Sequence, residues 1–268
     1  CFACHARGKS VESLIKAVEG YTTDQEVSLF IRTIGTKTIE EIRDDLRAKM
    51  LARKKMLNRV ASSPDLTETI EYKKYDGIDH GYLPNRGFKK KTIRANHIGY
   101  DRDAKSITIP VIEHGICRFM YRRFVNPTGK GAYRYPFDID KSSYLWGLDK
   151  PQEAYRSKTL YITEGALDAL WRRQNGYGNS VAILGSFLTE VQSKKIAALD
   201  PSQIVLFFDN DDAGYDATKH AGDTLLRLGI RSVFYVRYNK NSGSDPQTCT
   251  KGIIDRMISR KKHFYHFK

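Results

Sequence analysis

Hydrophobic and polar residues follow different periods in different parts of the chain. Over residues 9–62, apolar positions recur at steps of three and four, which predicts helix with a basic opposite face. The run Ser62-Ser63-Pro64-Asp65 ends this pattern. Short apolar or β-branched runs follow up to residue 155, separated by Gly, Asn, Asp and Pro, and they predict a mixed α+β region with antiparallel strands. The predicted strands are Ser106–Ile112, Ile116–Phe124 and Ala132–Phe137.

From Leu160 onward, short apolar segments alternate regularly with helical ones. The predicted strands are Leu160–Thr163, Val181–Leu184, Ile204–Phe208 and Ser232–Val236. The predicted helices are Ala166–Asn175, Thr189–Leu199 and Ala213–Leu228. This alternation indicates βαβ units and a parallel sheet flanked by helices, in which ligands bind at the carboxyl ends of the strands.

Acidic residues follow these predicted strands. Glu164 comes directly after the first strand and Asp168 lies one helical turn further on, while Asp209 and Asp211 follow the third strand. Asp245 comes after the fourth. Carboxylates gathered at one sheet edge repel one another, and a divalent cation relieves the repulsion. Since hard oxygen ligands favour Mg²⁺ or Mn²⁺, the sequence predicts such a site for phosphoryl or nucleotidyl transfer.

A simpler interpretation of part of this pattern is structural. A lone Asp-x-Asp at the end of a strand is often a turn or a helix cap, and Asp212 before Ala213 suits a cap. The order Glu164 and then Asp-x-Asp on neighbouring strands favours function over this alternative.

The charge of the chain suggests a polyanionic partner. Its 268 residues carry a net charge of +14. Nucleic-acid phosphates would explain this excess, and a solvated basic surface is the alternative. A membrane partner is disfavoured because no segment pairs a basic face with a strong apolar stripe. No apolar run is long enough to cross a bilayer, so we expect a cytoplasmic protein.

Two of the four cysteines stand at metal-ligand spacing. Cys1 and Cys4 form a Cys-x-x-Cys, which is half of a four-ligand zinc site, and we expect the other two ligands upstream. Cys117 and Cys249 are isolated and are expected to be buried, inert thiols.

Three segments resemble the Toprim domain, which is shared by primases, topoisomerases, OLD-type nucleases and recombination proteins. They are Glu164-Gly165-Ala166-Leu167-Asp168, Val181-Ala182-Ile183-Leu184-Gly185 and Asp209-Asn210-Asp211-Asp212-Ala213-Gly214. The preceding region indicates the member. Tyr82-Leu83-Pro84-Asn85-Arg86-Gly87-Phe88 resembles a motif of bacterial-type, DnaG-like primases, and the segment from Cys1 to Gly8 resembles the second half of their zinc ribbon.

The resemblance implies a domain order. Residues 1–8 would be the remnant of a zinc ribbon and 9–62 a helical basic linker. Residues 63–155 would form the α+β primase N-terminal subdomain and 156–247 the α/β Toprim domain. A helical tail, 248–268, would follow. Loose similarity to phage primases suggests a phage origin.

The resemblance also implies the activity and its partners. The chain would be a nucleotidyltransferase that makes short RNA primers on single-stranded DNA from ribonucleoside triphosphates. Glu164, Asp168, Asp209, Asp211 and Asp245 would bind Mg²⁺ or Mn²⁺, with Glu164 alternatively taking the hydroxyl proton. Zn²⁺ would bind in the full-length protein. Residues expected to line a positive groove are Arg86, Arg122, Arg123, Arg134 and Lys141, with only one of Arg122 and Arg123 facing it because strand neighbours point to opposite faces.

Two features depart from the family and two alternatives stay open. Arg134 stands where the family usually has Lys, and Asp245-Pro246-Gln247 lacks a second acid. No Walker A motif is present, so the helicase partner would be a separate chain, in a bacterial cell or a phage-infected host. The alternatives are a Toprim nuclease and a non-catalytic single-stranded-DNA-binding replication protein.

Overall fold

The computed structural model describes residues 72–267, with gaps at 127–130, 138 and 238–248. The predicted helical linker, Cys1, Cys4 and Asp245 lie outside the described residues. Within the described part, no helix is long and apolar enough to cross a membrane.

The first half of the described chain forms a four-stranded antiparallel sheet in the order β1-β2-β3-β4. Its strands are β1 Gly99–Asp101, β2 Ser106–Glu113, β3 Ile116–Phe124 and β4 Tyr133–Arg134. A 3-10 turn, Tyr72–Lys74, and two short helices, α4 Tyr82–Asn85 and α5 Lys90–Ala95, precede it. β4 is shorter than the predicted Ala132–Phe137, because Pro136 has no N–H with which to continue the pairing.

The second half forms a five-stranded sheet in the order β6-β5-β7-β8-β9. Its strands are β5 Thr159–Thr163, β6 Ser180–Ala182, β7 Gln203–Phe207, β8 Val233–Tyr235 and β9 Lys262–His263. The first four pair in parallel, as predicted, and β9 pairs with β8 in the antiparallel sense. The tail after residue 248 is therefore not wholly helical. The sequence did not predict β9, because Lys262 and His263 show no alternation of apolar and polar residues.

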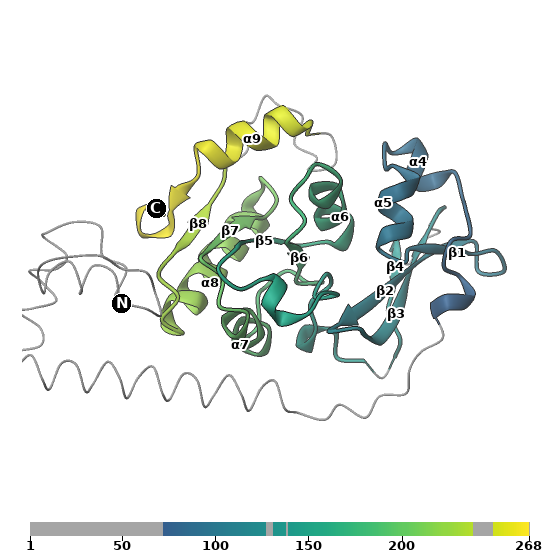
Figure 1. Cartoon of the computed structure of the whole chain (residues 1–268), viewed down its shortest axis with the longest axis horizontal. Coiled ribbons are helices and arrows are strands. Elements are labelled where there is room, and N and C mark those ends of the chain that lie inside the picture. Colours follow the sequence, from purple (N-terminus) through teal and green to yellow (C-terminus); the bar gives the residue numbers. More distant parts are fainter. Residues whose placement is uncertain (1–71, 127–130, 138, 238–248, 268) are drawn as a thin grey trace, which may run out of the picture.

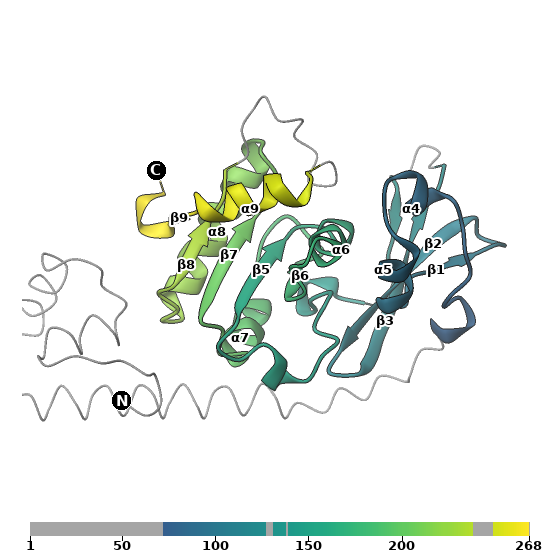
Figure 2. The same cartoon turned by 45° about the horizontal axis from the view of Figure 1, so that its top comes forward.

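Helices cover both faces of this sheet (Figures 1 and 2). They are α6 Ala166–Gln174, α7 Glu190–Ala198, α8 Asp212–Arg227 and α9 Lys251–Ser259. Alternate β7 residues point to opposite sides: Ile204 and Leu206 pack with α7 and α8, whereas Val205 and Phe207 pack with α9. The predicted starts and stops hold within a residue or two. Thr189 forms a capping box with Gln192, and Gly229 follows α8 at a φ of +79°.

The two sheets share a core. Ile109 and Phe119 from the antiparallel sheet pack in one cluster with Leu167 and Leu170 of α6. The connection between the halves adds hydrogen bonds, since Trp146 pairs with Ala182 of β6 in both directions, at 3.0 and 2.9 Å. The antiparallel sheet is thereby fixed beside α6, at the side of the parallel sheet (Figure 2).

Candidate active site

The junction of β5 and α6 positions the first two acids. Glu164 leaves the carboxyl end of β5, and Asp168 lies in the first turn of α6, whose N-cap is Gly165. A Cβ atom on Gly165 would lie 2.8 Å from Oδ2 of Asp168, so a glycine gives this carboxylate room beside the turn. Both acids are half-buried.

The junction of β7 and α8 positions the second pair. Asp211 is the N-cap of α8, and its Oδ1 accepts a hydrogen bond of 2.8 Å from the N–H of Gly214. The cap is thus Asp211 and not Asp212, which is the first residue of the helix. A Cβ on Gly214 would lie 2.0 Å from the carbonyl oxygen of Asp209, so only glycine fits this tight turn. Oδ2 of Asp211 makes no hydrogen bond to a described residue and stays available to a ligand.

These four carboxylates form one electrostatic group. The N–H of Asp209 donates to Oε1 of Glu164 at 3.1 Å, which links the two junctions directly. Burial, followed by the charges of Glu164, Asp168 and Asp211, raises the pKa of Asp209 to about 7. Burial is also the main cause that raises the pKa of Glu164, with added repulsion from Asp211 and Asp168. The sequence prediction that the acids gather at one edge agrees with this coupling.

Arg172 lies behind these acids and was not singled out in the sequence. Its side chain is 1% exposed, and its Nη1 donates to the backbone oxygen of Asp168 at 3.0 Å. Its guanidinium lies over the ring of Phe207 at 4.4 Å, and its charge lowers the pKa of Asp209 against the effect of burial. An arginine four residues after Asp168, on the face of α6 that carries apolar residues, was the signal available in the sequence.

The acids fit a hydrated divalent cation better than a fully protein-ligated one. In the described part of the chain, no three His, Cys, Asp or Glu side chains are arranged as a ready metal-binding group. Mg²⁺ usually keeps several waters and takes only one or two carboxylates together with substrate phosphates. A cavity of about 260 Å³ beside Asp209 and Asp211 gives room for such a ligand set. The protein donors are carboxylate oxygens, which suit Mg²⁺ or Mn²⁺.

An aromatic and basic wall, formed by the antiparallel sheet and α4, lies near Asp168. Arg123 sits between two tyrosines: its Nε donates to the hydroxyl of Tyr82 at 2.9 Å, and its guanidinium lies 4.7 Å from the ring centre of Tyr133. Burial is the main cause of the raised pKa values of Tyr121 and Tyr133, and the charge of Asp168 contributes to both. These four residues, Tyr82, Tyr121, Arg123 and Tyr133, are called the tyrosine wall below.

The other predicted basic residues divide between two faces of this sheet. Arg122 pairs with the buried Asp101 at 3.0 Å and lies opposite Arg134 in the β3–β4 register, so both project away from the face of Arg123. This differs from the expectation that Arg134 shares a groove with the acids. Lys141 lies 4.4 Å over the ring of Tyr135, which stacks on Tyr121. Arg86 contacts the Tyr82 hydroxyl at 3.4 Å.

Comparison with known proteins bears on this arrangement. A family model described as Toprim-like matches residues 161–248, the part that contains all five predicted acidic residues. The DNA primase of Chlamydia pneumoniae is 24% identical over 92% of this chain and 48% of its own length. The DNA primase of Deinococcus radiodurans is 35% identical over 55% of this chain and 26% of its own length.

Solved primase structures match both halves of the chain. The structure of the zinc binding and RNA polymerase domains of the Aquifex aeolicus primase matches with a TM-score of 0.62 and 20% identity. The match covers 98% of this chain and 72% of the Aquifex chain. The chain is similar to DnaG-like primases over both of its halves. A DnaG catalytic domain bound to single-stranded DNA also matches, with a TM-score of 0.59, 17% identity, and coverage of 81% of this chain and 82% of its own.

The similarity to DnaG-like primases agrees with the fold predicted from the sequence. At these identities the solved structures define the fold alone, which is an antiparallel unit joined to a sheet flanked by helices. The chain spans about half the length of the curated primases that match most of it.

Proposed function

We propose that this chain is the catalytic part of a DNA primase, which condenses ribonucleoside triphosphates into short primers on a single-stranded DNA template. One observation carries the proposal: Glu164, Asp168, Asp209 and Asp211 are coupled at the carboxyl edge of the parallel sheet and lie beside the tyrosine wall. The reaction needs both elements, since negative charge must be neutralised at the phosphates and a flat nucleotide base must be held.

The acids have distinct roles in this proposal. Asp168, Asp209 and Asp211 would hold a divalent cation, Mg²⁺ or Mn²⁺, which supplies charge stabilisation to the phosphoryl oxygens. Glu164, whose pKa burial raises, is suited either to join them or to take the proton of the attacking 3′ hydroxyl. Arg172 would keep the pKa of Asp209 from rising further and so favour the charged form that a cation needs. Asp245, after β8, is a further proposed ligand.

The wall would position the substrates. Arg123 and Lys141 lie on the same face of the antiparallel sheet as Tyr121 and would bind oxygens of the template or the triphosphate. Arginine can make two parallel hydrogen bonds to one phosphate. The half-buried Arg86 beside Tyr82 would assist from α4. Tyr133, which is 40% exposed, offers a ring on which a base can stack. Arg122 and Arg134, on the other face, would contact only the more distant template backbone.

Domain order and partners are part of the same proposal. Residues 63–155 would be the primase N-terminal subdomain, 156–247 the Toprim domain and 1–8 part of a zinc ribbon with Cys1 and Cys4 as ligands. A replicative helicase on a separate chain would deliver the template.

Asp209→Asn tests the proposal. We expect it to lower primer synthesis at least 100-fold, because it removes one of the carboxylates that would hold the cation. The control is Asp216→Asn, an exposed residue further along α8, which should retain full synthesis. The assay is incorporation of labelled ribonucleotide on single-stranded DNA with Mg²⁺. Equal synthesis by the two variants would contradict the role given to Asp209.

A further inference from the structure

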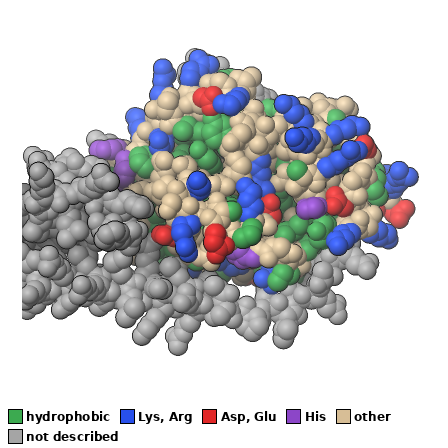
Figure 3. Space-filling view, in the orientation of Figure 1, with side chains coloured by type: hydrophobic (Ala, Val, Ile, Leu, Met, Phe, Trp, Pro, Cys, Tyr) green, Lys and Arg blue, Asp and Glu red, His purple; other side chains and the backbone are tan. Residues whose placement is uncertain are grey.

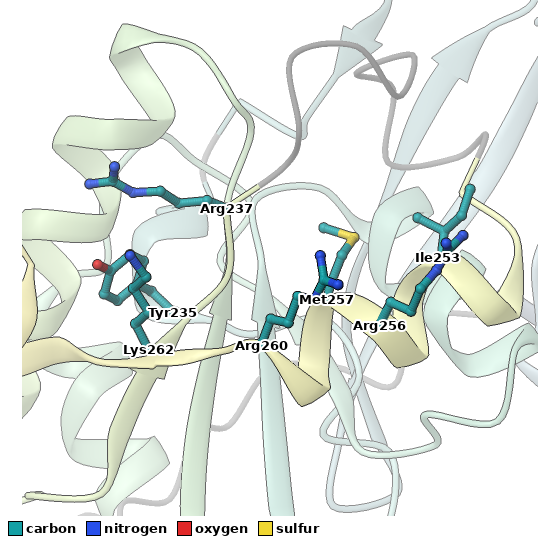
Figure 4. A pocket seen from close by; sticks show the side chains of 7 residues that line it. All are labelled: Tyr235, Arg237, Ile253, Arg256, Met257, Arg260 and Lys262. Carbon is teal, nitrogen blue, oxygen red and sulfur yellow. The ribbon is translucent and has the colours of Figure 1, made fainter.

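A second cavity, of about 400 Å³, lies between α9 and the strands β8 and β9 (Figure 4). Its lining residues are Tyr235, Arg237, Ile253, Arg256, Met257, Arg260 and Lys262. Four of these seven are cationic and none is acidic. The cavity shares Tyr235 and Arg237 with the one beside Asp209 and Asp211, so the two are neighbours at the end of β8. None of the proposed catalytic roles uses this second cavity, which is called the α9 cavity below.

The floor of the α9 cavity is apolar. Ile253 and Met257 lie one turn apart on α9 and are only partly buried, whereas Ile254 of the same helix is 1% exposed. Figure 4 shows the Met257 side chain rising from α9 between those of Arg237 and Ile253. In the space-filling view, hydrophobic surface at the upper left is bordered mostly by Lys and Arg (Figure 3). The site thus combines an apolar surface with a positive rim.

Three cations of the rim, Arg256, Arg260 and Lys262, have little compensation from acidic neighbours in the described part of the chain. Residues 251–267 contain five Lys or Arg and a single acid, Asp255, which already pairs with Lys251 at 2.8 Å. Within the described part of the chain, no carboxylate lies within ion-pair distance of Arg256, Arg260 or Lys262. Like charges gathered in this way repel one another, and a polyanion relieves the repulsion.

The spread of the cations identifies the ligand. Arg256 and Arg260 follow one another along α9, Lys262 lies on β9, and Arg237 stands at the other end of the cavity (Figure 4). Cations that converge on one point suit a single phosphate, whereas cations spread along a groove suit a chain of phosphates. Proteins that bind single strands combine such a basic groove with aromatic side chains on which bases stack. In the α9 cavity, Met257 and Ile253 offer apolar surface in that place.

We propose that the α9 cavity binds a segment of single-stranded nucleic acid, with phosphates on its four cations and a base against Met257 and Ile253. This rests on the proposed function, because the strand would be the one that passes the acids at the end of β8. The α9 cavity would therefore extend the template or primer path beyond the tyrosine wall.

The double variant Arg256→Gln with Arg260→Gln tests this in the full chain. Both residues are exposed, and glutamine removes the charge while keeping the first three side-chain carbons and a similar helix preference. We expect roughly tenfold weaker binding of a fluorescein-labelled oligothymidylate, measured by anisotropy, and a salt slope smaller by about 1.4 for two lost phosphate contacts. The charge-matched control is Lys158→Gln with Lys219→Gln, two exposed cations outside the cavity, which should bind within about twofold of the wild type.

The outcomes separate this inference from the proposed function. Affinity and slope equal to those of the control pair would overturn the α9 cavity as a strand site, whether or not the wild type makes primers. Loss of labelled ATP binding with unchanged oligothymidylate binding would overturn it too, in favour of a free nucleotide. Weaker strand binding by the cavity variant alone would support it, even if the wild type made no primers.

Discussion

At the residue scale, the candidate site depends on Asp209, whose backbone shapes the turn before α8 and whose carboxylate is coupled to three other acids. Its carbonyl approaches Gly214 so closely that no side chain fits there, and its N–H holds Glu164 in place. Its carboxylate is half-buried among three other acids, which stabilises the protonated form and raises the pKa. A bound cation would stabilise the charged form of these four carboxylates, because it offsets their mutual repulsion.

Gly214→Ala should damage the turn that carries Asp209. The added Cβ would lie 2.0 Å from the Asp209 carbonyl oxygen, so the backbone must shift, at a cost of about 1–3 kcal/mol in unfolding free energy. Primer synthesis should fall with it. Gly252→Ala in α9 meets no atom within 4 Å and should instead leave stability unchanged or raise it slightly. Denaturant melts of both variants measure the difference, and equal stabilities would contradict the close approach.

The raised pKa of Asp209 predicts a pH effect with a definite sign. The folded protein keeps the Asp209 proton up to about pH 7, whereas the unfolded chain releases it near the ordinary value of 3.8. Without divalent cations, this group therefore reduces stability as pH rises from about 4 to 7. Asp209→Asn should be more stable than the wild type at pH 8 in chelator, with the difference vanishing near pH 4. The opposite order at pH 8 would contradict the coupling of the acids.

At the element scale, buried polar contacts join the two sheets. Glu113, at the end of β2, is 3% exposed and accepts from the N–H of Leu145 at 3.0 Å and from Nζ of Lys195 on α7 at 2.7 Å. Arg173 of α6 donates to the carbonyl of Gly147 and to Asn96 beyond α5. These contacts hold the tyrosine wall in position beside the acids.

Lys195→Ala should loosen this junction. It leaves the buried Glu113 carboxylate without its charged partner, which costs about 3 kcal/mol in unfolding free energy. The neighbouring Lys194→Ala removes the same charge from an exposed pair with Glu190 and should change stability little. Thermal melts of the two variants measure the difference. A similar loss of stability in both would contradict a larger contribution from the Glu113–Lys195 pair.

The elements were predictable from sequence to different degrees. The parallel strands are short apolar runs and their helices are amphipathic, and residues such as Thr189 and Gly229 mark helix ends. Their bounds were therefore predicted within a residue or two. The tyrosine wall was not, because it depends on the pairing of β3 with β4 and on α4, which are brought together only by the fold. The same holds for β9 and for the position of Arg134 on the face away from Arg123. That Arg122 and Arg123 point to opposite faces was predicted, because strand neighbours alternate.

At the scale of the whole molecule, charge and fold support one account. The chain carries 45 Lys and Arg against 31 Asp and Glu, and many of its cations lie on the surface (Figure 3). Four of its acids are coupled where the parallel sheet ends. The sequence shows which acids follow which strands, so the strands, helices and acidic residues of the Toprim-like half could be predicted. The α9 cavity was not, because only the fold brings Tyr235 and Arg237 beside the lining residues of α9 and β9.

Product analysis on a single-stranded DNA template tests the central claim most directly. The chain would be incubated with Mg²⁺, the four ribonucleoside triphosphates and an end-labelled template, and the products resolved by length. The account predicts short, ribonuclease-sensitive strands complementary to the template, with the template itself intact. A shortened template without new strands would indicate a nuclease, and a gel shift with neither product would indicate a binding protein; either result would contradict the proposal.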